Sequence, residues 1–176
     1  MTCAGWGAVP RSFDVTTETS ATVAAVHSAF GDRDYWLARL AAYGGDSMTL
    51  DSLAVDADGT AAVTTVQDLR SDGLPGVFAR VLPGDLKLVR TETWRSADDG
   101  QVHGEVLISA HGVPGSGHGS AVLEPVPAGS RLRFAGTLEV RIPLVGGRIE
   151  QYIAHLIAKE IPEMQRFTTE WISDHG

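Results

Sequence analysis

The chain of 176 residues is long enough for one domain with a substantial hydrophobic core. Its 14 lysines and arginines against 22 aspartates and glutamates give a net charge of −8, which repels nucleic-acid phosphates. A nucleic acid is therefore excluded as the expected partner. Cys3 is the only cysteine, so neither an internal disulfide nor a cysteine-based zinc site can form.

The amino-terminal residues 1–10 precede the first strand pattern, and we expect them to be a disordered extension. An alternative is that translation begins at Val9 rather than at Met1. The first 13 residues lack the basic and apolar regions of a signal peptide. No apolar run approaches the roughly 20 residues that span a bilayer. We therefore expect a cytoplasmic protein without stable membrane insertion.

The first predicted elements are one strand and two short helices. Apolar and polar residues alternate over 12–18, as in a half-buried strand. Ser20 is a candidate cap for a helix over 23–30, where apolar residues recur at helical spacing. A second short helix is predicted over 33–43, with Gly44 as its stop.

Hydrophobic residues then alternate with a period of two for almost a hundred residues, which predicts an antiparallel sheet of three hairpins. The first and second hairpins are separated by the Gly- and Pro-rich residues 71–84. We expect this loop to gate a cavity with its apolar tip, Leu74, Val77 and Phe78. The predicted strands are 48–55 and 61–69, 85–95 and 101–110, and 118–126 and 131–144.

The last predicted element is a long amphipathic helix from Arg148 to Ile172. Its apolar residues, from Ile149 onward, are mostly spaced by three or four, so one broad face is apolar. Pro162 lies inside it and lacks a backbone N–H, which predicts a kink near Ala158. Helices gathered on one face of an antiparallel sheet indicate an α+β fold.

This order of elements, with the motifs PRSFDV, DYWLARLAAYGG, TVQDLR, RTETW and IPLVGGRIEQYIA, resembles the START-like superfamily, also called helix-grip, Bet v 1-like or SRPBCC. The motifs resemble more narrowly an uncharacterised bacterial family within it, a domain of unknown function. The resemblance implies one domain over residues 11–176. In it, a curved seven-stranded antiparallel sheet wraps around the long carboxyl-terminal helix, and two short helices follow the first strand.

The resemblance also implies a largely apolar cavity between the sheet and the long helix. Members of the superfamily bind lipids, sterols, polyketides or plant hormones; some are polyketide cyclases or dehydratases, and others are interaction modules. The narrow family offers no catalytic residue to carry over to this sequence.

The glycine pair Gly146 and Gly147 does not form a phosphate-binding loop, because Arg148 and Ile149 follow in place of Lys and Ser or Thr. With Gly147 as the cap residue, the carboxylate of Glu150 would occupy the positive end of the helix dipole and repel an anion. We favour a hinge, in which the glycines let the last strand turn sharply and the helix start pack closely.

Residues 111–120, HGVPGSGHGS, lack the helix that must follow a dinucleotide fingerprint, and we expect a flexible loop. His103, His111 and His118 could approach one another, and three imidazoles would suit zinc. Their spacings match no standard motif, so we expect neither a metal nor a cofactor. His103 and Glu105 fall on the face that we expect to be external.

Arg90 and Glu92 share one face of their predicted strand with Leu86, Leu88 and Trp94. If this face is interior, the charged pair could orient a polar head group or act as acid and base. The interpretation we favour is that the pair lies toward the open rim of the cavity, or that a bulge turns it outward.

The sequence thus predicts a carrier or sensor that binds a hydrophobic or amphipathic small molecule, rather than an enzyme. One alternative is a polyketide cyclase or dehydratase with ionisable groups inside the cavity. Another is an interaction module whose cavity is filled and whose outer sheet or loop contacts a protein. The ligand and the oligomeric state stay open. The expected ligand-binding residues are Trp94, Val106, Ile108, Phe134, Leu138, Ile153 and Ile157, with Arg90 and Glu92 as polar anchors.

Overall fold

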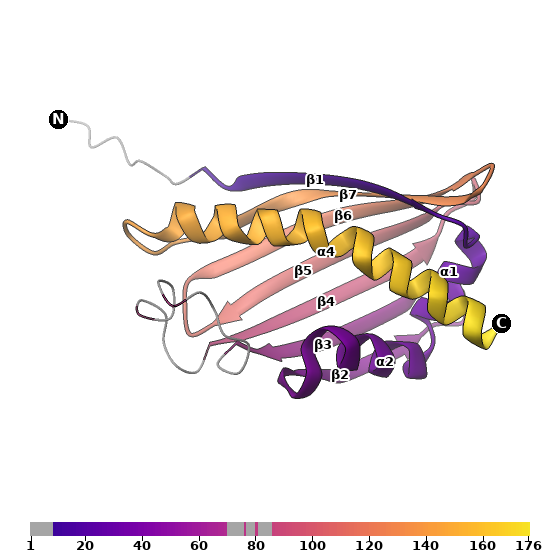
Figure 1. Cartoon of the computed structure of the whole chain (residues 1–176), viewed down its shortest axis with the longest axis horizontal. Coiled ribbons are helices and arrows are strands. Elements are labelled where there is room, and N and C mark those ends of the chain that lie inside the picture. Colours follow the sequence, from indigo (N-terminus) through magenta and orange to yellow (C-terminus); the bar gives the residue numbers. More distant parts are fainter. Residues whose placement is uncertain (1–8, 70–75, 77–79, 81–85) are drawn as a thin grey trace.

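The computed structural model describes residues 9–69, 76, 80 and 86–176. The predicted gate residues Leu74, Val77 and Phe78 lie outside the described residues, as does most of the predicted extension. In the described chain, seven antiparallel strands form one sheet, as the sequence predicts, and β1 pairs with β7 (Figure 1). In spatial order the strands are β1 (Arg11–Thr19), β7 (Gly129–Val140), β6 (Gly115–Val126), β5 (Val102–His111), β4 (Lys87–Ser96), β3 (Ala61–Asp68) and β2 (Met48–Val55).

The two short helices α1 (Val23–Phe30) and α2 (Arg33–Gly44) follow β1, as predicted, and a 3-10 turn, η1 (Gly45–Ser47), leads to β2. The predicted cap at Ser20 is wrong. The side chain of Thr22 caps α1 and accepts a hydrogen bond from the Ala25 N–H at 3.2 Å, since it lies directly before the first helical residue.

The long helix α4 (Gly146–His175) crosses one face of the sheet and changes direction near its middle (Figure 1). Pro162 lies within it, as the predicted kink requires. In the part of the chain that the structure describes, no helix is long and apolar enough to cross a membrane.

Glycines on the inner face of the sheet make room for aromatic rings. A Cβ atom at Gly104 would overlap the ring of Trp94, and one at Gly119 would overlap the ring of Phe134. The prediction of a flexible loop over 111–120 is therefore wrong for its second half, because residues from Gly115 onward are strand β6. The glycines in this sequence let side chains pack closely against the strand; they do not make it a flexible loop.

The turn from β7 to α4 differs from the predicted hinge. β7 ends at Val140, and Leu144, not a glycine, takes the left-handed conformation, with φ of 70°. Gly146 is needed because a Cβ there would overlap the carbonyl oxygen of Val140, whereas a Cβ at Gly147 would meet open space. The cap residue of α4 is Val145 rather than Gly147, since the helix already begins at Gly146.

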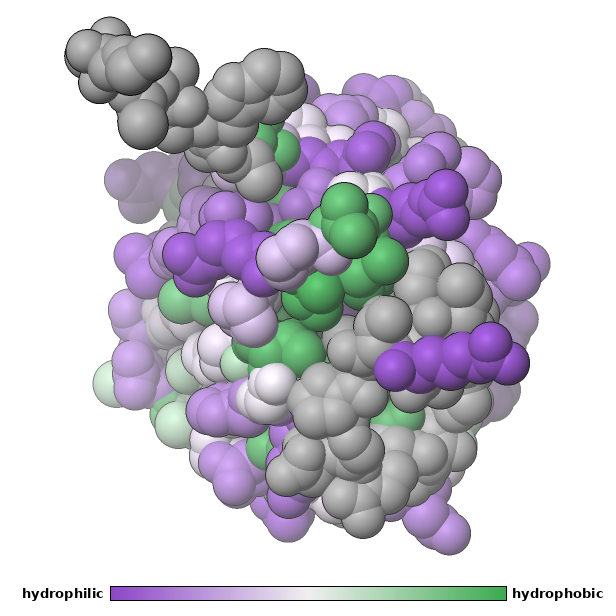
Figure 2. All heavy atoms as spheres, turned by 90° about the vertical axis from the view of Figure 1, so that its left-hand side faces the viewer, coloured by the Kyte–Doolittle hydropathy of each residue, from purple (hydrophilic) through white to green (hydrophobic). Residues whose placement is uncertain are grey.

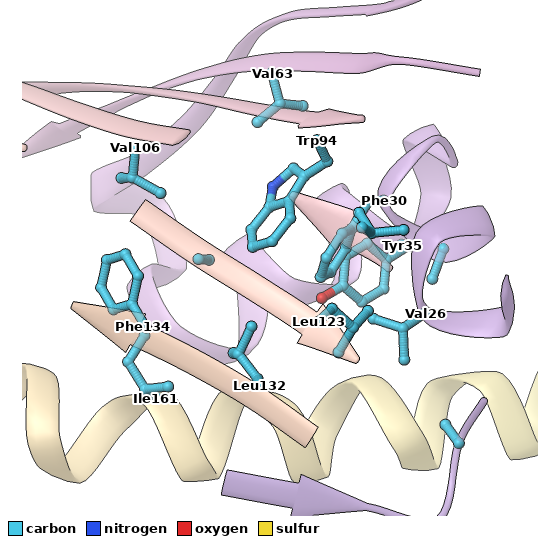
Figure 3. Packing of buried hydrophobic residues seen from close by; sticks show 14 of the residues in the cluster. Val26, Phe30, Tyr35, Val63, Trp94, Val106, Leu123, Leu132, Phe134 and Ile161 are labelled. Carbon is cyan, nitrogen blue, oxygen red and sulfur yellow. The ribbon is translucent and has the colours of Figure 1, made fainter. Parts of the chain in front are cut away.

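The core lies under the carboxyl-terminal part of α4, where aromatic residues of α1, α2 and β4 meet. The ring centroids of Phe30 and Trp94 are 4.6 Å apart, and those of Tyr35 and Trp36 are 5.4 Å apart. The indole N–H of Trp36 donates a hydrogen bond of 2.8 Å to the Phe30 carbonyl, so this buried polar group is satisfied. Figure 3 shows Phe30, Tyr35 and Trp94 gathered on one side of this core, with Ile161 of α4 below Phe134.

Candidate functional site

A small interior cavity of about 30 Å³ lies between the sheet and α4. This volume holds roughly one water molecule, whereas sites for small molecules measure about 300–1,000 Å³. Its lining combines three charged residues and one amide with apolar residues. The lining residues are Phe30, Arg39, Arg90, Glu92, Trp94, Val106, Leu132, Phe134, Ile161, Met164 and Gln165.

Glu92 lies inside the protein, so the favoured interpretation of the Arg90 and Glu92 pair is wrong. The residue is 1% exposed, and its carboxylate Oε1 lies 2.7 Å from Nε of Arg90. The indole N–H of Trp94 donates a 2.9 Å hydrogen bond to the other oxygen, Oε2. β4 pairs in continuous register with β3 and β5, so no bulge turns these side chains outward.

The carboxylate of Glu92 is stabilised in its ionised form. Burial on its own raises the pKa of Glu92, but the charges of Arg90 and Arg39 and the Trp94 hydrogen bond outweigh it. The pKa therefore lies below its ordinary value. Glu92 thus carries a fixed negative charge at neutral pH rather than an exchangeable proton.

Arg39 of α2 brings a second positive charge and, unlike the partly exposed Arg90, is itself buried. Its guanidinium Nη2 lies 4.0 Å from Glu92 Oε1, and its Nη1 donates to the hydroxyl of Tyr35 at 3.4 Å. Thr168 Oγ1 donates to the Met164 carbonyl at 2.8 Å, so Tyr35 is the donor in its 2.7 Å bond to Thr168. This chain of hydrogen bonds ties α2 to the carboxyl-terminal part of α4.

Among the described residues, Arg90 has a buried side-chain atom without a hydrogen bond, and the amide of Gln165 faces the interior cavity beside it. Gln165 is 4% exposed, and within the described ranges no residue forms a hydrogen bond with its side-chain amide. The Nε atom of Arg90 is buried and lies 2.7 Å from Glu92 Oε1, but this ion pair lacks the alignment of a hydrogen bond. Such groups are rare in protein interiors and call for an explanation.

The cover that α4 gives to the sheet is uneven. Its buried residues lie at its start, at Gly146, Ile149 and Glu150, and again from Ile161 onward. Residues 151–160, which we call the middle stretch, contain no buried side chain, although Ile153 belongs to the apolar face. The backbone N–H of Val140 donates a 2.9 Å hydrogen bond to Glu150 and anchors the helix start.

The end of the molecule at which α4 begins exposes apolar surface. Figure 2 faces this end and shows apolar residues gathered beside hydrophilic ones. Leu144, in the turn before α4, is fully exposed.

The structure brings five of the predicted ligand-binding residues together around the interior cavity: Trp94, Val106, Phe134, Arg90 and Glu92.

The other four predicted residues lie outside the lining of the interior cavity. Ile108 and Ile157 are partly buried against the core, and Leu138 is buried under the sheet's inner face. Ile153 is half-buried in the middle stretch of α4.

Sequence reasoning missed the contribution of α1, α2 and the terminal part of α4 to the cavity. The sequence did indicate that Arg39 faces the core. Arg39 follows Tyr35 by four residues and Trp36 by three, so it lies on the same face of the helix. A similar indication existed for Gln165, four residues after Ile161. A charged or polar residue at a core-facing position is the pattern that would have identified both.

A second hollow, of about 480 Å³, lies on the opposite face of the sheet. Leu107 is 48% exposed there, and His118 lies 3.3 Å from the carboxylate of Glu105. His103 and Glu105 are exposed, as predicted. Among the described residues, no group of three metal-ligating side chains is close enough to hold a metal ion.

The sequence matches the family described as "Protein of unknown function (DUF2505)" over residues 14–172. The uncharacterized protein Rv0481c of Mycobacterium tuberculosis (strain ATCC 25618 / H37Rv) is 39% identical over 173 residues, which cover 95% of this chain and 99% of the relative. Mb0491c, an uncharacterized protein of Mycobacterium bovis, gives the same values.

Solved structures with the same fold have low sequence identity to this chain. TTHA0849 from Thermus thermophilus has a TM-score of 0.58 at 16% identity and covers 94% of this chain and 99% of its own. A START superfamily protein from Mycobacterium smegmatis has a TM-score of 0.51 at 11% identity, and Ara h 8.0201 one of 0.51 at 12%; both cover 94% of this chain and 99% of their own. These similarities confirm the START-like fold predicted from the sequence.

Proposed function

The chain belongs to the DUF2505 family of proteins of unknown function, and from that premise we propose that it binds an amphipathic small molecule between the sheet and α4. The START-like fold is a ligand-binding fold, which supports this class of activity. In this proposal the protein acts as a carrier or sensor. The apolar part of the ligand lies among the apolar lining residues, and its polar end meets Arg39, Arg90 and Glu92.

The observation that carries the proposal is the charged group inside the core. A buried ion pair is seldom more stabilising than well-packed apolar residues of the same volume, because both charges lose their hydration. Here two arginines and a glutamate line a cavity together with the unpartnered amide of Gln165. Stability alone gives no reason for this arrangement, whereas recognition of a polar group does.

A ligand of useful size requires the interior cavity to expand. The middle stretch of α4 contributes only partly buried side chains, so moving it away from the sheet exposes less apolar surface than moving the part from Ile161 onward would. The helix is held at both ends, by Glu150 at its start and by Ile161, Gln165 and Thr168 further on. We propose that the ligand enters beneath the middle stretch while these two ends stay in place.

The chemistry of the site favours binding over catalysis of proton transfer. The lowered pKa of Glu92 keeps it ionised at neutral pH, so it cannot serve as a proton donor there. Arginine does not release its proton in proteins. Fixed charges of this kind orient a ligand, which is the role we propose for them.

The test is native mass spectrometry of freshly purified protein, followed by titration with the neutral fluorescent dye N-phenyl-naphthylamine. Val106→Phe adds bulk to the cavity lining and is expected to weaken dye binding about tenfold or more. Ile157→Asp places a charge on the inner side of α4 and is expected to have a similar effect. His155→Asp changes an exposed residue of the same helix and is the matched control.

Thermal unfolding of each variant shows whether it is folded. A folded wild-type protein that binds neither the dye nor any of a panel of fatty acids, sterols and polyketides contradicts the proposal. That outcome would favour the interaction module, for which the hollow around the exposed Leu107 is the surface to examine.

A further inference from the structure

Positive charge exceeds negative charge in the lining of the interior cavity. Arg39 and Arg90 contribute two positive charges, and Glu92 contributes one negative charge. Of the described carboxylates, Glu92 alone lies within ion-pair distance of either arginine. The lining therefore has an excess of one positive charge, which an anion of a single charge would balance.

Hydrogen-bond donors also exceed acceptors at this site. Both oxygens of Glu92 are engaged, Oε1 by the arginines and Oε2 by the Trp94 N–H. Arginine has donors only, and the Nε–H of Arg90 forms no well-aligned hydrogen bond although Glu92 Oε1 lies 2.7 Å from its nitrogen. The amide of Gln165 adds two N–H donors and one carbonyl acceptor to the cavity wall, so the excess of donors comes from the arginines.

From these two imbalances we infer that the amphipathic ligand ends in a carboxylate, which Arg90 and Gln165 bind at the charged end of the interior cavity. This inference rests on the proposed function. A carboxylate supplies a single negative charge and two acceptor oxygens, which match a guanidinium in a paired, charge-assisted geometry. The fixed charge of Glu92 disfavours a ligand with a second negative charge.

The apolar part of the same ligand has a defined direction. Leu132 and Phe134 line the cavity from β7, which two strands separate from β4 with Arg90 and Glu92. Figure 3 shows these two side chains and Ile161 together between the sheet and α4. A straight alkyl chain attached to the carboxylate would lie against them and continue beneath the middle stretch of α4.

Three ligands of equal chain length separate the contributions. Decanoate, decanol and decylamine are each titrated at neutral pH against the wild-type protein loaded with N-phenyl-naphthylamine. Decanoate is expected to displace the dye at a concentration about tenfold or more below that of decanol, because hydrogen bonds to a charged group are the stronger ones. Decylamine is expected to bind most weakly, because its ammonium group meets two arginines.

Two variants connect the preference to the named residues. Arg90→Gln is expected to weaken decanoate binding about tenfold and to leave decanol unchanged, and Gln165→Leu is expected to act in the same direction more weakly. Arg133→Gln removes an exposed charge that pairs with Glu124, and it serves as the matched control. Thermal unfolding checks that each variant is folded. If Arg90→Gln does not fold, the decanoate and decanol affinities of Gln165→Leu test the inference instead.

Equal affinities for decanoate and decanol would overturn the inference and leave the proposed function standing. Equal losses of decanoate and decanol affinity in Arg90→Gln would overturn it as well, since they would show a structural role for the arginine. Failure of all three compounds to displace a bound dye, or failure of the dye to bind, would count against the proposed function itself.

Discussion

Two stretches of α4 carry apolar residues at the same spacing, yet only one of them is buried. From Ile161 onward, which we call the terminal stretch, Ile161, Gln165 and Thr168 are buried, and Phe167 and Trp171 pack against the core. The middle stretch, residues 151–160, contains no buried side chain.

The short helices contribute to this difference. α2 supplies Tyr35 and Tyr43, whose rings lie 5.4 Å from Trp171 and 5.9 Å from Phe167. The terminal stretch is thus enclosed between the sheet and α2. Stability is concentrated on the side of the molecule that α2 covers, and the other side is free to serve binding.

The largest expected effect comes from Glu92→Gln, which removes the charge that connects α2 to the sheet. The buried Arg39 and the partly exposed Arg90 are then left without this counter-charge, and the free energy of unfolding is expected to fall by about 3–5 kcal/mol. Urea denaturation at neutral pH measures this change. A loss below about 1 kcal/mol would show that solvent reaches the arginines and that the terminal stretch does not depend on this pair.

The stability difference between the wild type and Glu92→Gln is also expected to depend on pH. The pKa of Glu92 in the folded protein lies below its ordinary value of 4.5, so its stabilising contribution is fully present above about pH 4.5. That contribution is lost as the pH falls through the folded-state pKa. The stability difference between wild type and Glu92→Gln is therefore expected to shrink below pH 4.5. A difference that stays constant in acid would contradict the ionised state of Glu92.

A matched pair of truncations compares the two stretches directly. Ile161→Ala leaves a cavity in the buried terminal stretch and is expected to cost about 2–4 kcal/mol of unfolding free energy. Ile153→Ala, in the half-buried middle stretch, is expected to cost less than about 1 kcal/mol. Chemical denaturation of both variants tests the contrast, and equal losses would show that the middle stretch is as firmly packed as the terminal one.

The start of α4 offers a second matched pair, with a smaller effect. Gly146→Ala is expected to destabilise the protein by about 1–3 kcal/mol, because its Cβ overlaps the Val140 carbonyl. Gly147→Ala faces open space and is expected to stabilise the helix by up to about 1 kcal/mol. Thermal unfolding distinguishes them, and similar shifts for both would contradict the close approach at Gly146.

Local patterns predicted the elements of this fold well. Alternation placed Arg90, Glu92 and Trp94 on one face of β4, and spacing by three and four predicted α4. Which face is interior depends on how the strands pair and on where α2 lies, and neither is encoded within one strand. The local pattern therefore predicted that Arg90, Glu92 and Trp94 share a face, but it could not predict that Glu92 is buried.

Local patterns were equally unable to predict which part of α4 is buried against the rest of the protein. The apolar spacing is uniform along α4, whereas burial follows from contacts with Tyr35 and Tyr43, more than a hundred residues earlier in the sequence. The positive φ of Leu144 was equally unpredictable, because two glycines nearby were the expected residues for that conformation.

The smallest predicted effect concerns Glu160, the last residue of the middle stretch. Burial raises the pKa of Glu160, and the negative charge of Glu163 adds to the rise, while Arg90 opposes it. The ionised form is thus disfavoured in the folded protein, and this cost is present above the folded-state pKa. Glu160→Gln is expected to stabilise the protein at neutral pH by less than about 1 kcal/mol, since solvent screens a half-exposed group.

This gain has a pH dependence opposite to that of Glu92. Below the ordinary pKa of 4.5 the wild-type carboxyl is protonated in both the folded and the unfolded state, so the advantage of Glu160→Gln is expected to vanish. Urea denaturation of both variants and the wild type, at neutral and at acidic pH, measures the contribution of each carboxyl to the free energy of unfolding. A destabilising Glu160→Gln would mean that Glu160 supports Arg90, and the excess positive charge at the interior cavity would then be smaller than the ion pairs indicate.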